Sequence, residues 1–440
     1  MNEEQIIKAI NTYTIDLYGK LKELGKNLFF SPFSIFITLL MVLVGARGKT
    51  KTQIKEALHI TSEQASLHSE FKKLLRIFQN KGGSELYLAN LMCVQEMCPP
   101  LDEYLWTLED KYKGELWCLD FSDSKATCNR INSWVNQQTR GKIKKIIGTV
   151  TENTIFILLN AIYFKGKWFH QFKKKDTFID PFKLISGEEV MVCMMFQKKY
   201  FRYIEEDGYK VLEMPYGGEI SPQYLRGPPV RKPPVRSPPV KVTTQSPISN
   251  ILGQTSMVVF LPNKKNGLTE LENELTSDKI YENLSRMQNT QRRDVEVYFP
   301  RFKIETSYGL IKSHRELGIT DAFNFNADLS GIIDNPPIYI TDFIHKAYVE
   351  VNEKGTEAAA VTMMTAIPIS APPPKALEFR VDHPFLYPII DLQTGIILFL
   401  GRVMKPEGSL PPPGSKPNRP PSLREELQKE LGRIFHKLRK

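Results

Sequence analysis

The chain has 440 residues, of which 41% are hydrophobic and 10% aromatic, so it has ample material for a sizeable core. Its length alone would suggest two or three domains, although single domains of this size exist. The formal net charge is +10, but nine of those ten charges lie in two segments, 219–254 and 405–440. The rest of the chain is nearly neutral, which argues against nucleic acid as a partner.

The cysteines are odd in number and show neither CxxC nor metal-ligand spacing: Cys93, Cys98, Cys118, Cys128 and Cys193. We interpret them as thiols in a reducing compartment and expect no metal and no cofactor. The first 24 residues carry charges throughout and lack the apolar core and cleavage site of a signal peptide. These features predict a cytoplasmic monomer, with unconventional secretion through an uncleaved internal signal as the alternative.

The first 24 residues show an imperfect helical pattern, which predicts an amphipathic helix that covers the core. The uncharged run Leu28 to Ala46 is near membrane-spanning length, but polar residues and Pro32 interrupt it, so we predict a strand that turns into a buried helix at S-P-F-S. A helical segment from Leu67 to Phe78 carries a basic side. We interpret that side as a solvated face.

Leu86 to Gln95 is predicted to be a strand, and Leu101 to Tyr112 and Ala126 to Thr139 are predicted to be helices. Ile155 to Phe164 is almost continuously apolar, which is typical of a strand buried on both faces. Its single polar side chain, Asn160, needs a hydrogen-bonding partner, because an unpaired buried amide costs roughly 1 to 3 kcal/mol.

Val211 to Tyr216 and Thr255 to Pro262 are predicted to be consecutive strands. Between them, residues 219–254 repeat P-P-V-R-K, P-P-V-R-S and P-P-V-K-V, a composition that favours polyproline II and has no core-forming pattern. We interpret this insert as a solvated excursion. A ligand for a signalling domain is the alternative, but the repeat lacks the PxxP spacing that such a ligand requires.

The most informative stretch runs from Glu353 to Ser370 and reads E-K-G-T-E-A-A-A-V-T-M-M-T-A-I-P-I-S. It is too long for an ordinary connection and too poor in charge for a disordered one. At period two, one face carries mostly small side chains: Thr356, Ala358, Ala360, Thr362, Met364 and Ala366. Such a segment could enter between two existing strands, with Gly355 and Thr356 as the hinge.

This stretch closely resembles the hinge and reactive-centre loop of the serpins, E-x-G-T-E-A-A-A. N-L-F-F-S-P-F-S-I, E-V-Y-F-P-R-F-K-I and F-R-V-D-H-P-F-L-Y-P-I resemble further serpin motifs in the expected order. The resemblance implies an α+β fold: a single serpin domain, 1–404, with three β-sheets, a surrounding set of helices and an exposed reactive-centre loop. The family has no catalytic site of its own, so we do not expect an enzyme.

The resemblance implies that the chain inhibits serine proteases as a suicide substrate, since the cleaved loop of an inhibitory serpin inserts as a central strand and traps the acyl-enzyme. The reactive bond is expected between Ile369 and Ser370. The hinge comprises Glu353, Gly355, Thr356, Glu357, Ala358, Ala359 and Ala360. Ile369 suits an elastase-like or chymotrypsin-like serine endopeptidase and offers no cation to a trypsin-like one. A non-inhibitory carrier, chaperone or storage protein is the alternative, which the small hinge residues disfavour.

The family also implies a hydrogen-bonded cluster under the sheet that opens. Its members here would be Asn160, Ser34 and His345, and the cluster would hold two strands together until it rearranges. Trp168, in F-K-G-K-W, matches the family tryptophan near the top of that sheet, where insertion begins.

Two features depart from the family. Pro388 removes a backbone donor where a central strand is expected, which leaves an edge position or a bulge as explanations. Residues 405–440 form a proline-rich linker and a basic amphipathic segment, in which Ser422 and Glu425 have the spacing of a helix capping box. We interpret this tail as docked on its own domain or frayed, with binding to heparin or an anionic membrane as the alternative.

Overall fold

The computed structural model describes residues 3–61, 69–73, 84–217, 255–356 and 376–408. The helices have the following bounds: α1 (Glu3–Leu21), α2 (Pro32–Gly45), α3 (Gly48–Ala57), α5 (Asp102–Tyr112), α6 (Ser124–Gln138), α8 (Leu268–Glu274), α9 (Ser277–Asn289) and α10 (Ile311–Glu316), with 3₁₀ turns η1 (Lys174–Asp176) and η2 (Asp321–Phe323). Of the predicted helix Leu67 to Phe78, residues 69–73 are described and are helical.

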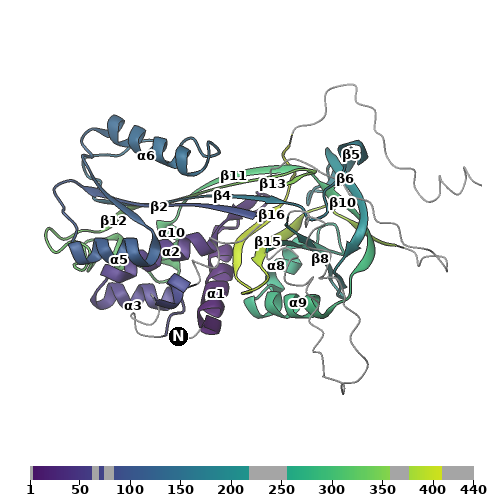
Figure 1. Cartoon of the computed structure of the whole chain (residues 1–440), viewed down its shortest axis with the longest axis horizontal. Coiled ribbons are helices and arrows are strands. Elements are labelled where there is room, and N and C mark those ends of the chain that lie inside the picture. Colours follow the sequence, from purple (N-terminus) through teal and green to yellow (C-terminus); the bar gives the residue numbers. More distant parts are fainter. Residues whose placement is uncertain (1–2, 62–68, 74–83, 218–254, 357–375, 409–440) are drawn as a thin grey trace, which may run out of the picture.

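The strands form three sheets, as the α+β prediction requires (Figure 1). The central sheet has the order β11 (Phe302–Gly309), β12 (Ile340–Val351), β4 (Phe156–Lys167), β2 (Ser84–Gln95) and β3 (Glu115–Leu119), and the short β13 (Gly355–Thr356) pairs with β4. A second sheet has the order β1 (Leu28–Phe30), β16 (Ile397–Val403), β15 (Phe385–Asp391), β9 (Thr255–Pro262), β8 (Tyr209–Pro215) and β7 (Tyr203–Glu205). The third has the order β14 (Leu377–Arg380), β10 (Arg293–Pro300), β6 (Glu189–Phe201) and β5 (Thr177–Lys183).

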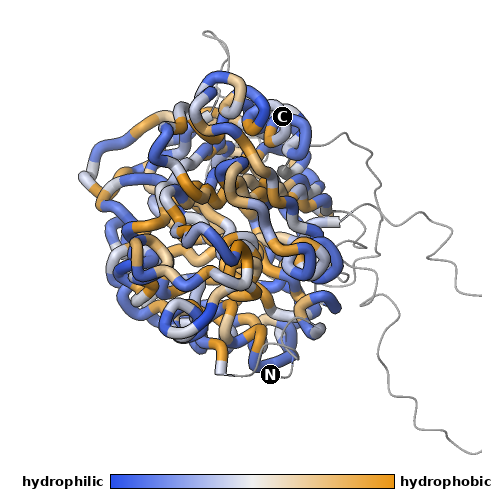
Figure 2. Tube along the Cα trace, turned by 90° about the vertical axis from the view of Figure 1, so that its left-hand side faces the viewer, coloured by the Kyte–Doolittle hydropathy of each residue, from blue (hydrophilic) through white to orange (hydrophobic). Residues whose placement is uncertain are grey.

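The central sheet is covered on both faces. Along β4, Leu158 and Ile162 pack into the main core together with α2, while Leu159 and Ala161 pack into a second cluster that includes Ile131 of α6. Figure 1 shows α6 on one side of β2 and β4, with α2 and α5 on the other. The predicted doubly buried strand is therefore confirmed. Figure 2 shows that hydrophobic parts of the chain lie inside the molecule and hydrophilic parts lie outside.

The uncharged run Leu28 to Ala46 folds as β1 followed by α2, as predicted. Ser31 caps α2, because its side chain accepts a hydrogen bond from the backbone N–H of Ser34 at 3.1 Å, and Pro32 occupies the first helical position, where no backbone donor is needed. Almost every residue of α2 is buried. Among the helices of the described residues, none combines the length and the apolar character needed to cross a membrane.

Pro388 lies in the middle of its sheet, so the edge-strand explanation is wrong. It pairs with Leu400 of β16 on one side. On the other side the register to β9 passes from Leu386, opposite Phe260, directly to Ile389, opposite Met257. The missing backbone donor thus falls where the ladder to β9 is interrupted, and a local irregularity of a central strand accommodates the proline.

The predicted neighbours β8 and β9 pair antiparallel, from Tyr209 opposite Pro262 to Pro215 opposite Ser256. The insert 219–254 that joins them, and the tail beyond residue 408, lie outside the described residues. The domain boundaries that we assigned to them therefore remain a prediction.

Candidate functional site

The predicted hinge begins a new strand beside β4. The chain leaves β12 at Val351 and turns through Glu353 and Lys354, while Asn352 and Gly355 exchange two backbone hydrogen bonds of 3.0 and 3.1 Å. Gly355 then pairs with Lys167 and Thr356 with Gly166. Because β13 runs antiparallel to β4 and bridges back to the end of β12, it lies between these two strands at one end of the central sheet.

Gly355 is required for this close approach. Its φ angle is +129°, a conformation that residues with a side chain rarely adopt. A Cβ added at this position would lie 2.2 Å from the carbonyl oxygen of Gly166 and 2.6 Å from the backbone nitrogen of Trp168. The hinge glycine therefore lets the backbone of β13 sit against the backbone of β4.

Trp168 binds the hinge turn. Its indole Nε1–H donates to the carbonyl oxygen of Asn352 at 3.0 Å, and its backbone N–H donates to that of Lys354 at 3.0 Å. The indole is 1% exposed and stacks on Tyr216, with 4.5 Å between the ring centroids. Trp168 therefore lies against the hinge. It takes no part in the hydrogen bonds among Ser34, Asn160 and His345, with which we had grouped it.

Glu353, which lies in the same turn, anchors it to the third sheet. Its side chain is almost fully buried, and its Oε1 accepts a hydrogen bond from Thr177 Oγ1 at 2.6 Å and another from the guanidinium of Arg301. Burial alone would raise the pKa of Glu353, but the hydrogen bonds from Arg301 and Thr177 outweigh it and hold the pKa below its ordinary value. We call Glu353, Arg301 and Thr177 the hinge latch. Sequence reasoning named Glu353 but missed its two partners.

The structure brings Asn160, Ser34 and His345 together. His345 and Asn160 are register partners on β12 and β4, and His345 Nδ1 lies 2.5 Å from Asn160 Oδ1. Asn160 Nδ2 in turn lies 2.5 Å from Ser34 Oγ, on α2. All three residues are fully buried. The bond between His345 and Asn160 crosses the boundary between β12 and β4, where a new strand would have to enter.

Two further members of this polar cluster were missed. Asn90 lies opposite Asn160 on β2, and its Oδ1 is 2.5 Å from Asn160 Nδ2 and 3.3 Å from Ser34 Oγ, which donates to it. Thr38, one turn after Ser34 on α2, places its Oγ1 3.2 Å from Asn160 Nδ2. Asn90 is an amide in an otherwise apolar strand, the same signal that identified Asn160, so it could have been found.

His345 is neutral in this cluster. The backbone N–H of Ser31 donates to His345 Nε2 at 3.2 Å, so Nε2 must carry a lone pair, and the proton lies on Nδ1 and points to Asn160. Burial lowers the pKa of His345 to about 3. His314 is a second buried neutral histidine: its Nδ1–H donates to Leu310 at 2.7 Å, its Nε2 lies 2.8 Å from the Tyr13 hydroxyl, and burial lowers its pKa to about 4.

These two histidines predict an acid-sensitive fold. Both have folded-state pKa values below the ordinary 6.5, so their contribution to stability is complete above pH 6.5 and is lost as pH falls toward 4. Each of the two histidines should lower the free energy of unfolding at pH 5 by about 2 kcal/mol relative to its value at pH 7.5. Urea unfolding at the two pH values measures this loss, and the variant His314→Gln should reduce it by about 2 kcal/mol, the contribution of that one histidine; burial also lowers the pKa of His170 to about 4, which adds a third contribution. Equal stability of the parent chain at both values would contradict the assignment.

The remaining predicted site residues fall in 357–375, outside the described residues. They are Glu357, Ala358, Ala359, Ala360, Ile369 and Ser370. The structure therefore places the start of the loop, and its reactive bond remains a prediction.

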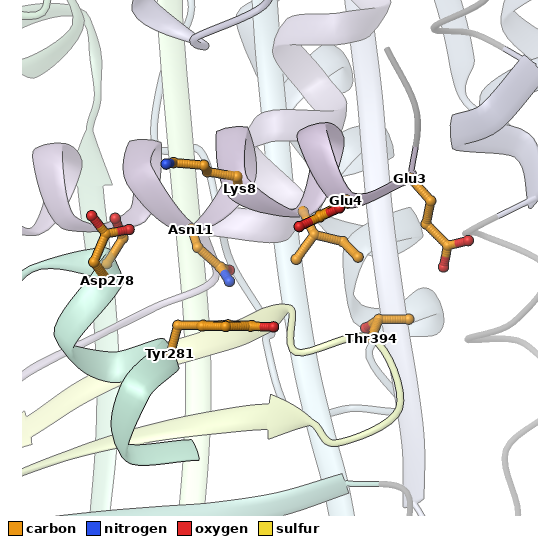
Figure 3. Close-up of a pocket in the computed structure, with 9 residues that line it drawn as sticks. Glu3, Glu4, Lys8, Asn11, Asp278, Tyr281 and Thr394 are labelled. Atoms are coloured by element: carbon orange, nitrogen blue, oxygen red, sulfur yellow. The ribbon is translucent and has the colours of Figure 1, made fainter. Parts of the chain in front are cut away.

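A cavity of about 450 Å³ lies apart from the hinge, between α1, α9 and the turn at Thr394. Figure 3 shows Asn11 pointing from α1 toward Tyr281 of α9. Asn11 is already engaged, since its Nδ2 donates to Gly395 and its Oδ1 accepts from Ile397 N–H. No hinge or cluster residue lines this cavity.

In this mixed fold the central sheet already pairs with the first residues of a loop, which defines a class of loop-inserting proteins. Comparison with known proteins identifies the family. The family model described as "Serpin (serine protease inhibitor)" matches residues 8–225 and 250–406. Leukocyte elastase inhibitor A of Rattus norvegicus is 37% identical over 416 residues, which cover 92% of this chain and 100% of that protein.

Two solved structures agree. The thermophilic serpin tengpin in its native state has a TM-score of 0.76 and 25% identity, over 91% of this chain and 94% of that one. Human thyroxine-binding globulin, solved with its hormone, has a TM-score of 0.76 and 27% identity, over 92% of this chain and 100% of that one. The chain belongs to the serpin family.

Proposed function

We propose that this protein inhibits a serine endopeptidase as a suicide substrate. The target's serine attacks the carbonyl of Ile369, the bond to Ser370 breaks, and the freed loop enters the central sheet before the acyl-enzyme is hydrolysed. The chain itself supplies the bait and the insertion and needs no catalytic residue of its own. The family description as serine protease inhibitors supports this proposal.

The observation that carries the proposal is the position of β13. Gly355 and Thr356 already pair with Lys167 and Gly166 of β4, so a strand continued from them in the same register would run along the boundary between β12 and β4. The polar cluster at His345 and Asn160 lies further along that boundary and would break as the strand advances. The same sheet therefore contains the strand pairing at which insertion would begin, the strand boundary along which it would proceed, and the polar cluster that would resist it.

An elastase-like target fits best. Ile369 presents a β-branched aliphatic side chain to the target's specificity pocket and carries no charge for a trypsin-like pocket. The leukocyte elastase inhibitors of rat and human, which are 37% and 36% identical to this chain over their whole length, support the same class of target. A chymotrypsin-like enzyme is the next candidate.

The alternative is a serpin that carries a ligand and inhibits nothing; the thyroxine-bound globulin illustrates that the fold can hold a small molecule. The hinge disfavours it, because the sequence T-E-A-A-A offers small side chains to an opening sheet. The tail at 405–440 is proposed to bind heparin or an anionic membrane through its basic residues, and the proposed location is the cytoplasm with unconventional secretion as a second route.

The experiment is to mix the full chain with an elastase-like protease and to analyse the products on a denaturing gel. We expect a covalent complex that survives boiling in detergent, together with a carboxy-terminal fragment that begins at Ser370. A trypsin-like protease, which cannot accept Ile369, serves as the control and should give no complex. Clean cleavage at Ile369 without any complex would refute the inhibitor proposal.

A further inference from the structure

A second cavity, of about 510 Å³, lies directly beside the hinge latch, and its volume is in the range of sites for small molecules. One side is the start of β6, and the other is the segment that follows β16. The lining residues are Val190, Met191, Val192, Cys193, Arg301, Lys405, Pro406, Glu407 and Gly408. The latch residue Arg301 is thus one wall of a cavity that the proposed inhibition does not use.

The segment 405–408 is fixed in place as the opposite wall. The backbone N–H of Lys303 donates to the carbonyl oxygen of Glu407 at 2.5 Å, which ties this segment to β11. Pro406 and Val192 are buried and give the cavity an apolar surface, while Met191 is exposed at its side. An apolar surface beside a charged group suits an amphipathic ligand.

Arg301 supplies the charged group. Its backbone N–H donates to the carbonyl oxygen of Cys193 at 2.8 Å, which fixes it next to the thiol, and its Nη2 donates to Glu353. Its Nε is buried and finds no acceptor among the described residues. A guanidinium can bind carboxylates along more than one edge, and the Arg301 side chain, which is 26% exposed, lines the cavity, so it can take a second acceptor there beside Glu353. Lys405 adds a second cation to the lining, against the single carboxylate of Glu407.

We propose that this cavity binds a small carboxylate with an apolar tail, such as the anion of a short-chain fatty acid. The carboxylate lies on Arg301, and the tail lies against Val192 and Pro406. The ligand and Glu353 then share one guanidinium, so binding weakens the ion pair between Arg301 and Glu353 and loosens the hinge latch. The site is a property of the folded chain, and its test does not depend on whether the chain inhibits a protease.

The thiol of Cys193 reports occupancy, because it lines the cavity. The full chain is alkylated with iodoacetamide, and the modification of each cysteine is followed by mass spectrometry, with hexanoate as the probe and hexanol as its uncharged counterpart. We expect hexanoate to slow the alkylation of Cys193 about tenfold at saturation and hexanol to have little effect. The exposed Cys118, in the central sheet, should react at the same rate throughout. Equal protection by hexanol, or none by hexanoate, would overturn the proposal.

Two variants that break the same ion pair separate ligand binding from loss of the latch. Glu353→Gln removes the competing carboxylate and leaves Arg301, so hexanoate should protect Cys193 at a lower concentration than in the parent chain. Arg301→Gln removes the cation, so protection should disappear. Circular dichroism checks that both variants are folded. Loss of protection in both variants, or in neither, would show that Arg301 does not bind the carboxylate.

Discussion

Replacing Gly355 by alanine is expected to turn this chain from an inhibitor into a substrate. The new Cβ would lie 2.2 Å from the carbonyl oxygen of Gly166, and the φ angle of +129° is strained for alanine. Relief requires β13 to leave β4, so the cleaved loop would start to insert more slowly. Each 1.4 kcal/mol added to the insertion barrier shifts the competition toward hydrolysis about tenfold. The measurement is the ratio of covalent complex to cleaved chain on a denaturing gel.

Gly187→Ala is the matched control for this prediction. Gly187 also has a positive φ angle, +89°, but an added Cβ there would meet no atom within 4 Å. It lies in the turn between β5 and β6, away from the hinge, so this variant tests strain without the clash. It should form complex as the parent chain does. If Gly355→Ala also formed complex normally, pairing of β13 with β4 would have no role in inhibition.

The second large effect is expected from Asn160→Ala, which removes the centre of the polar cluster. His345 Nδ1–H would lose its acceptor, and Asn90 Oδ1 would lose one of its donors, both at positions shielded from water. The unsatisfied Nδ1–H of His345 costs roughly 1 to 3 kcal/mol, and the cavity left by the amide adds to this, so the free energy of unfolding should fall by about 2 to 4 kcal/mol, while Asn90 Oδ1 keeps Ser34 as a donor. Urea unfolding measures the change. The boundary between β12 and β4 would also lose the side-chain bond that spans it.

Thr38→Val provides the comparison within the same cluster. It preserves the shape of the side chain and removes the hydroxyl, which accepts from Asn160 Nδ2 at 3.2 Å and donates to the carbonyl oxygen of Ser34 at 3.1 Å; Asn160 Nδ2 keeps other acceptors. Its cost should be about 1 kcal/mol. A loss for Asn160→Ala no greater than that for Thr38→Val would show that the cluster does not stabilise the sheet.

Much of the fold could be predicted from the sequence because its signals are local. The apolar run Ile155 to Phe164 is typical of a doubly buried strand, and S-P-F-S favours the start of a buried helix, so β4 and α2 were predicted from a few residues each. Pro388 was harder, because its cost depends on the register of two neighbouring strands, which no local pattern contains.

The site was predictable only in part, for the same reason. Asn160 stood out as a lone amide in an apolar strand, and the family resemblance supplied His345 and Ser34 as candidate partners. The hinge latch could not be assembled in this way, since Arg301 and Thr177 lie 52 and 176 residues from Glu353 along the chain. Arg301, at the junction of β10 and β11, favours a carboxylate as its partner, but the sequence does not say which carboxylate it will meet.

The two described ends of the loop lie in different sheets. β13 pairs with β4 of the central sheet, whereas β14, where the chain resumes at its far end, pairs in parallel with β10 of the third sheet from Val295 opposite Leu377 to Tyr298 opposite Arg380. If the strand is extended from Gly355 along β4, the loop has to move with it, but its far end is held by the pairing of β14 with β10. Cleavage of one peptide bond in the loop would separate the two ends. A protease would therefore remove the restraint on a strand whose first residues, in β13, are already paired with β4.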